Sequence, residues 1–169
     1  MKKQELKERQ AELKAVYQRE PAAAQQTLSA VATLDFDNLA CKISRPAFLD
    51  PAGLHPSSGG DGTFACPVEI MLAGLVSCAG VTLTAVASSM HLNITKGRVI
   101  AEGDMDFCGT LGCNKAAPVG LTAIRLLFEL ESKEEQSKID KLIELTHRYC
   151  VVHRTFDAPP AVEVKVNLI

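Results

Sequence analysis

The chain has 169 residues, a length that suits a single domain or one half of an intertwined dimer. With a formal charge of -2 and no tryptophan, it offers neither a basic face nor aromatic stacking platforms, so nucleic-acid binding is not expected. The first twenty residues are charged throughout and resemble no secretory signal. We therefore expect a cytoplasmic protein whose six cysteines are reduced, and in that compartment disulfides tend to be catalytic or sensory.

The N-terminal part of the chain predicts a helix followed by a hairpin. Apolar residues share one face of the first segment, and Glu20, which precedes a proline, is expected to end it. We assign residues 1–27 to an N-terminal helical extension. Residues 28–34 and 39–45 alternate around a turn-rich segment and predict a β-hairpin. A long loop rich in proline, glycine and serine follows as far as Gly62.

The most apolar segment is residues 67–90, in which Glu69 is the only charge. Pro67 suits the first position of a helix, and Glu69 in the first turn complements the positive end of its dipole. A run of this length could span a membrane. However, it is rich in small and hydroxyl side chains and lacks aromatic belts and a basic flank. We therefore predict a helix that is buried on all its sides inside a soluble protein, and we expect no membrane association.

The C-terminal half predicts two strands, a helix and a last strand. Residues 92–106 and 118–131 have strand-like composition. Ser132 and Glu135 have capping-box spacing and open a helix that runs to about Tyr149. The closing Ala-Val-Glu-Val-Lys-Val-Asn-Leu-Ile alternates cleanly as a strand. This order of elements indicates an α+β fold, and a helix apolar on every face favours dimerisation because one chain offers too little cover.

The cysteines occupy different electrostatic settings. Cys66 lies at the start of the apolar helix, where the dipole lowers a thiol pKa, or is simply a small junction residue. Cys78 lies in mid-helix among apolar residues, which suits a core cysteine and raises the thiol pKa unless a cation is near. Cys150 lies at a helix end, where the negative end of the dipole disfavours a thiolate. Such a thiol suits a resolving role better than that of first nucleophile.

Two further groups of side chains could carry chemistry. His147 shares a helix face with Cys150 and has arginines nearby, a cluster that supports redox or nucleophilic chemistry unless it is merely solvated. Cys108 and Cys113 form only one pair, whereas structural zinc needs four ligands. We therefore expect no metal site.

Two segments carry a resemblance to a known family. The run from Pro67 to Leu83, with Cys78 inside Leu-Val-Ser-Cys-Ala-Gly, resembles the central helix of the OsmC/Ohr family. The segment His-Arg-Tyr-Cys-Val-Val around Cys150 is similar to that family's second cysteine site. The order of elements agrees over residues 28–169, which we assign to an OsmC-like domain. Residues 1–27 resemble an extension found in one branch of the family.

The resemblance implies an intertwined homodimer in which antiparallel sheets wrap around paired apolar helices. It also implies a peroxiredoxin-like enzyme that reduces organic, lipid-type hydroperoxides in oxidative-stress defence. Peroxidatic Cys78 would become a sulfenic acid, resolving Cys150 would condense with it to a disulfide, and an external lipoyl-type dithiol would restore both. No bound cofactor is implied. The family's activating pair would correspond to Arg45 and to Glu69, which lies one residue beyond the family position held here by Val68.

Two alternatives remain open at this point. The first is a non-catalytic OsmC-like dimer that binds a small apolar ligand, which Val68 at the glutamate position favours. The second is a redox sensor in which Cys66, Cys108 or Cys113 reacts instead. The sequence assigns no role to Cys41.

Overall fold

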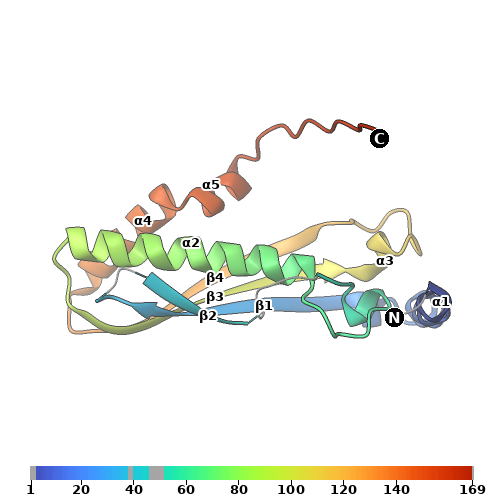
Figure 1. Cartoon of the computed structure of the whole chain (residues 1–169). Coiled ribbons are helices and arrows are strands. Elements are labelled where there is room, and N and C mark those ends of the chain that lie inside the picture. Colours follow the sequence, from blue (N-terminus) through green and yellow to red (C-terminus); the bar gives the residue numbers. More distant parts are fainter. Residues whose placement is uncertain (1–2, 38–39, 46–51, 169) are drawn as a thin grey trace.

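The computed structural model describes the backbone of residues 3–37, 40–45 and 52–168, and the side chains of residues 8–37 and 52–168. One long helix lies across one face of an antiparallel sheet (Figure 1). The strands, in the spatial order β2-β1-β3-β4, are β1 (Gln25–Asp35), β2 (Ala40–Arg45), β3 (Ile94–Asp106) and β4 (Leu121–Ser132). The helices are α1 (Lys3–Arg19), α2 (Pro67–Ser89), α3 (Phe107–Thr110), α4 (Gln136–Tyr149) and α5 (Val151–Asp157), with short 3-10 turns η1 (Pro21–Ala24) and η2 (Pro56–Ser58).

The main core lies between α2 and the sheet. Alternate residues of β1 point inward and are buried, as strand geometry requires. From the other side, α2 contributes Leu72, Leu75, Val76 and Leu83, all fully buried. Antiparallel pairing of β1 with both β2 and β3, and of β3 with β4, completes the layer. The predicted α+β class and the N-terminal hairpin are therefore confirmed.

A single chain leaves one side of α2 uncovered, as the sequence predicts for a helix that is apolar on every face. Met71 and Val81 are exposed, and Gly74 and Cys78 are only partly covered. The physical reason is that one sheet covers only one face of a helix that is apolar around its circumference. Among the described residues, α2 is the one helix long and apolar enough to cross a membrane by length and composition. Half of its most apolar stretch is already buried within the chain.

The start of α4 differs from the capping-box prediction. The helix begins at Gln136, and its N-cap Glu135 makes no capping bond through its side chain. The Ser132 hydroxyl instead accepts from the N–H of Glu134 at 3.1 Å and donates to the carbonyl of Asn93 at 2.9 Å. Ser132 therefore ties the end of β4 to the start of β3 and does not cap the helix.

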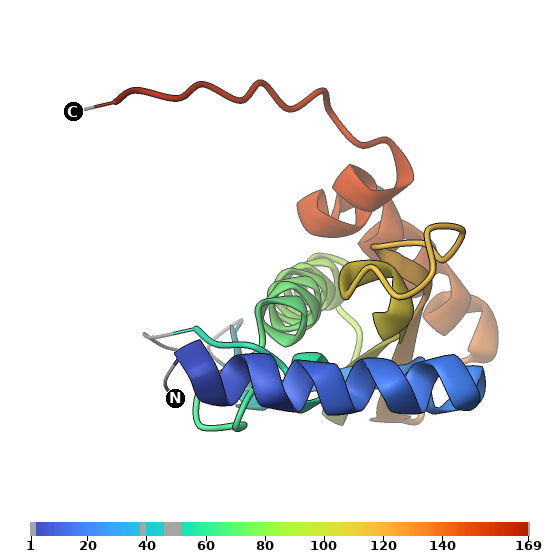
Figure 2. The ribbon, with the colours of Figure 1, turned by 90° about the vertical axis from the view of Figure 1, so that its right-hand side faces the viewer.

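The last predicted strand lies outside the sheet. After α5, which the sequence did not predict, the chain extends away from the body (Figures 1 and 2). Its apolar side chains alternate as expected, but each is at least 79% exposed. They are Val162, Val164, Val166 and Leu168. The segment has the pattern of a strand and no ladder partner among the described residues.

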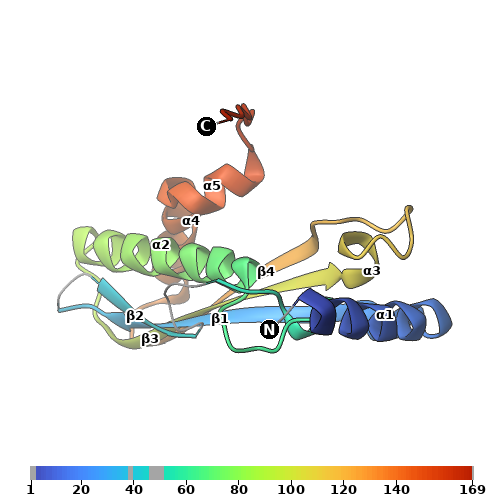
Figure 3. The same cartoon turned by 45° about the vertical axis from the view of Figure 1, so that its right-hand side comes forward.

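Helix α1 lies across the end of the sheet that carries α3 (Figures 2 and 3). The Tyr17 hydroxyl donates to the carbonyl of Ser57 at 2.8 Å, and the Gln10 amide donates to the carbonyl of Ser58 at 3.0 Å. Tyr17 is 4% exposed and belongs to a second, smaller apolar cluster with Phe107 and Cys108. The N-terminal helix is therefore docked on the body through the η2 turn and this cluster.

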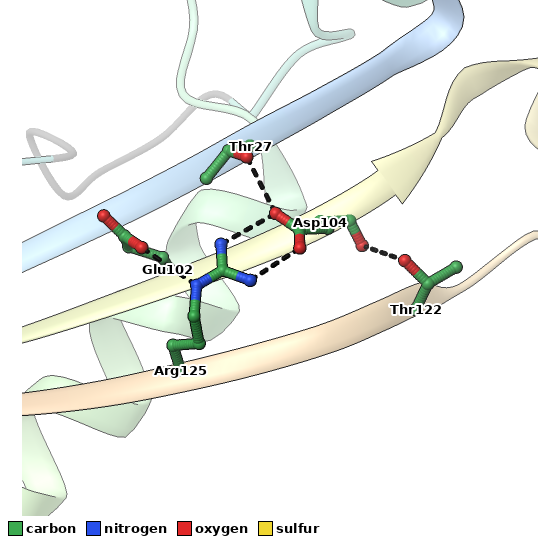
Figure 4. Close-up of polar contacts among 5 residues, drawn as sticks. All are labelled: Thr27, Glu102, Asp104, Thr122 and Arg125. Atoms are coloured by element: carbon green, nitrogen blue, oxygen red, sulfur yellow. Dashed lines mark hydrogen bonds and ion pairs between the residues drawn. The ribbon is translucent and has the colours of Figure 1, made fainter. Parts of the chain in front are cut away.

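The face of the sheet turned away from α2 carries a network of ion pairs. Arg125 binds both carboxylate oxygens of Asp104, at 2.6 and 2.8 Å, and its Nε donates to Glu102 at 3.1 Å (Figure 4). Thr27 donates to the same Asp104 carboxylate at 2.7 Å, and Thr122 donates to the Asp104 carbonyl at 3.2 Å. These bonds hold the pKa of the Asp104 carboxyl well below its usual range, Arg125 being the main cause.

Replacing Asp104 by Asn tests the contribution of this network. A carboxyl whose folded pKa is depressed stabilises the fold above its ordinary pKa of 3.8, and that contribution is lost as the pH falls through the folded pKa. We expect wild type to exceed Asp104→Asn in free energy of unfolding at pH 7, with a gap that narrows below about pH 4. Urea unfolding at pH 7 and below about pH 4 measures this gap in free energy. The Arg125→Gln variant, which removes the other side of the same ion pair, is measured in parallel. An equal gap at both pH values would contradict it.

Candidate functional site

Cys78 and Cys150 lie close together where α4 and α5 pack against α2. Cys78 lies in the middle of α2 and is partly buried, whereas Cys150, between α4 and α5, is 1% exposed. Both α4 and α5 pack against α2, and the two cysteines belong to the same apolar core. The Cys78 side chain lies close enough to raise the pKa of the Cys150 thiol. Residues 72 positions apart in sequence thus interact.

The position of Cys150 follows from the buried face of α4. Leu142 and Thr146 are fully buried, and Cys150 continues their four-residue spacing. The N–H of Cys150 donates to the carbonyl of Thr146 at 2.9 Å, closing the last turn of α4. The carbonyl of Cys150 in turn accepts from the backbone N–H of Arg154 at 2.9 Å, and this bond begins α5. The turn between the two helices therefore directs this thiol onto α2.

Burial dominates the electrostatics of Cys150. It raises the pKa of the Cys150 thiol to about 11, and contact with Cys78 adds to the rise. The backbone N–H groups of His153 and Val152 act in the opposite direction on the same pKa. Desolvation, and not the helix end expected from the sequence, is the largest cause of this weak acidity. At neutral pH, Cys150 is a protonated thiol.

The histidines beside this junction stack on one another. The rings of His147 and His153 lie 4.6 Å apart at 18°, and Phe128 flanks His147 at 6.0 Å. Burial lowers the pKa of His147, and the neighbouring His153 lowers it further. Arg154 is engaged with Asp157 at 2.8 Å. His147 is therefore largely neutral at pH 7 and does not supply a cation to the cluster.

The structure does not bring Glu69 to Cys78 within one chain. The first turn of α2 is regular, since the N–H of Ile70 donates to the carbonyl of Cys66 at 3.0 Å. Nine residues of regular helix amount to about 13 Å of rise and about half a turn of rotation. Glu69 instead lies near His55 and acts on its pKa.

Arg45 is described only through its backbone. It ends β2, where it pairs with Val31 across the hairpin. Its side chain lies outside the described residues, as does that of Cys41. The assignment of Arg45 as an activating cation therefore stays a prediction.

The sequence analysis did not identify which positions of α2 stay uncovered. The positions Met71, Gly74, Cys78, Val81 and Ala85 follow alternating steps of three and four and form one stripe, which we call the open stripe. A Cβ added at Gly74 would meet no atom within 4 Å. The three-and-four spacing was the available signal. It was hidden because the opposite face of the helix is equally apolar.

Comparison with known proteins decides the family. A family model described as OsmC-like protein matches residues 60–165, a range that includes both Cys78 and Cys150. The chain belongs to the OsmC-like protein family. This membership was expected from the two cysteine segments and is confirmed. No curated protein matches the sequence.

Two solved structures are similar to this chain. One is a crystal structure of an OsmC-like hydroperoxide resistance protein from Jannaschia sp. CCS1. It has a TM-score of 0.63 and 16% identity, covering 86% of this chain and 95% of that one. The other is an OsmC-like protein from Mycoplasma pneumoniae, with a TM-score of 0.52 and 22% identity, covering 76% and 86% respectively. At these identities the likeness concerns the fold, and it confirms the OsmC-like fold.

The contact between the thiols predicts a measurable effect on Cys150. Because Cys78 raises the pKa of Cys150, Cys78→Ala should shift that pKa from about 11 toward the ordinary 9.0, while burial keeps it elevated. The measurement is the pH midpoint of Cys150 alkylation, followed by mass spectrometry of its peptide. Cys66→Ala, at the N-cap of α2, is the control. An unchanged midpoint in Cys78→Ala would show that the thiols do not interact.

Proposed function

We propose that this OsmC-like protein reduces organic hydroperoxides through a thiol cycle of Cys78 and Cys150. The observation that carries the proposal is that packing of α4 and α5 on α2 brings these two side chains, from distant parts of the chain, into one apolar core where they interact. A resolving thiol must reach the first sulfur as soon as the latter is oxidised. In this pair the resolving thiol is already in place before any oxidation.

The cycle balances with one hydroperoxide and one dithiol. The Cys78 thiolate attacks the distal peroxide oxygen, the O–O bond breaks, and the alcohol leaves with a proton while Cys78 becomes a sulfenic acid. The Cys150 thiol then displaces hydroxide from that sulfur, forming a disulfide and releasing water. A small dithiol of the lipoyl type reduces the disulfide by two exchange steps and becomes a disulfide itself.

The surroundings of the two thiols support this order of events. The pKa of Cys150, about 11, keeps it protonated at pH 7, so it is poorly suited to attack the peroxide first. Cys78 lies on the open stripe, where it is only partly buried. Its neighbours on the stripe are Gly74, which has no side chain, and Val81, which is apolar. This setting favours an organic hydroperoxide over hydrogen peroxide.

The cycle requires a compartment that keeps thiols reduced, and we propose the cytoplasm. The described cysteines are all free thiols. The relative from Jannaschia sp. CCS1 is named as a hydroperoxide resistance protein, which agrees with an oxidative-stress role.

Peroxide consumption with a dithiol tests the cycle. We expect Cys78→Ser to fall to the rate measured without protein. Cys150→Ser should give at most one turnover and then accumulate a sulfenic acid, since the second thiol is missing. Cys66→Ser, a buried cysteine at the start of α2, is the matched control and should retain turnover. Full activity of Cys78→Ser would refute the proposal. An inactive wild type that still binds an apolar probe would favour a non-catalytic binding role.

We further propose that the active form is a homodimer. The open stripe leaves Met71 and Val81 exposed, at 38% and 43%, on the most apolar helix. The extended tail leaves four alternating apolar side chains in solvent. A second copy packed on the stripe would bury both α2 helices, and exchange of tails would give each tail a strand partner. Because Cys78 lies on the stripe, the second copy would form the other wall of the substrate site.

Val81→Asp tests this assembly. An aspartate in the middle of a helix pair would be buried without a partner, so we expect a monomer with weakened peroxide consumption. Light scattering after size-exclusion chromatography measures the mass. Val119→Asp, at a site 64% exposed in the loop before β4, is the matched control and should leave the mass unchanged. A monomeric wild type at micromolar concentration would refute the dimer.

A further inference from the structure

A second pair of cysteines lies at the turn that follows β3. Helix α3 ends with Gly112 at φ 66°, a left-handed conformation that favours glycine. The N–H of Gly112 donates to the carbonyl of Gly109 at 3.1 Å, and the N–H of Cys113 donates to the carbonyl of Cys108 at 3.0 Å. These two bonds define a Schellman motif. In that motif the side chains at the positions of Cys108 and Cys113 commonly contact each other.

The contact is present here between two thiols. Cys108 and Cys113 pack in the same small apolar cluster under α1, and Cys113 lies close enough to raise the pKa of Cys108. The backbone bond between the same two residues, with standard bond lengths, limits their Cα atoms to a separation of about 7 Å. A disulfide needs Cα atoms within about 7 Å of each other. The turn therefore already has the backbone spacing that a disulfide needs.

The turn is held in this shape from both sides. The Asp106 carboxylate accepts from the N–H of Cys108 at 2.8 Å and caps the start of α3. A Cβ on Gly109 would lie 2.0 Å from the carbonyl oxygen of Pro118, so the returning loop presses closely on the helix. The contact between the two thiols thus belongs to an ordered turn and does not depend on a chance approach.

We propose that Cys108 and Cys113 form a second, separate redox site that closes to a disulfide by exchange with a low-molecular-weight disulfide. The Cys113 thiolate attacks that disulfide, forms a mixed disulfide and releases one small thiol. The thiolate of Cys108 then attacks the Cys113 sulfur, forms the internal disulfide and releases the second small thiol, so two protein thiols are oxidised for one disulfide reduced.

Exposure decides which thiol reacts first. Cys113 is partly exposed, whereas Cys108 is 6% exposed. Burial raises the pKa of Cys108, and the neighbouring Asp106 and Cys113 raise it further. Cys113 is therefore the entry point and Cys108 the buried partner.

This site is distinct from the Cys78–Cys150 pair. The cluster around Cys108 touches α2 at Val68, ten residues before Cys78, which corresponds to about 15 Å along the helix. The proposal therefore does not depend on the peroxide cycle.

The disulfide would act on the docking of α1. Tyr17 lies in the same cluster, and both cysteine thiols act electrostatically on its hydroxyl, whose pKa burial raises. The same hydroxyl donates to Ser57 and holds α1 on the body. Closing the disulfide changes the packing directly beneath this anchor.

Peptide mapping of the wild-type protein tests the site. After equilibration with glutathione and glutathione disulfide, remaining thiols are alkylated and the protein is cut with trypsin. Residues 99–115 form one tryptic peptide that holds Cys108 and Cys113 and no other cysteine. We expect this peptide to lose two hydrogens and take up no alkylating agent. A peptide that is fully alkylated, or that carries only glutathione on Cys113, would overturn the proposal.

Tyrosine fluorescence gives an independent readout of the effect on α1. The chain has two tyrosines and no tryptophan, so Tyr149→Phe leaves Tyr17 as the reporter. We expect its emission to fall on oxidation, because a disulfide quenches an adjacent tyrosine. Addition of Cys113→Ser should abolish the fall and leave peroxide consumption unchanged. A disulfide formed without any change in Tyr17 emission would refute the link to α1.

Discussion

The structure depends on one imbalance: α2 is apolar around its circumference, and the sheet of a single chain covers only half of it. The covered half supplies the core, through fully buried leucines and valines that face β1 and β3. The uncovered half is the open stripe, and Cys78 lies in its centre. The cysteine proposed to react first is thus placed at the edge of the apolar core, where it is only partly buried. A soluble helix with one polar face would have placed this residue in water.

Cys150 is held in place by the packing of α4 against α2. A buried row of Leu142, Thr146 and Cys150 along α4 fixes the second thiol against α2, and the break between α4 and α5 presents it there. Burial makes it a poor acid. The two thiols therefore differ in depth, since Cys150 is buried and Cys78 is only partly covered. That difference in depth is what assigns them separate roles in the proposed cycle.

The elements with strong local signals were predictable from the sequence. Pro67 and the apolar run located α2 to within one residue, and strand-like composition located β3 and β4 within a few residues. Features that depend on tertiary contacts were not predictable. Ser132 bonds to Asn93, which lies 39 residues away just before β3, and does not cap α4, and the short helix α5 buries none of its residues. The approach of Cys78 to Cys150 depends on how two helices pack, which no spacing within either segment encodes. Their assignment as a pair came from the family resemblance alone.

The extended tail affects the single chain before it associates with a second copy. An alternating row of exposed valines on an unpaired backbone is a template for strand addition by any available edge. Native burial of this row through association would make folding stability rise with protein concentration, by mass action. At low abundance the same segment would be the first to be cut by proteases or drawn into aggregates.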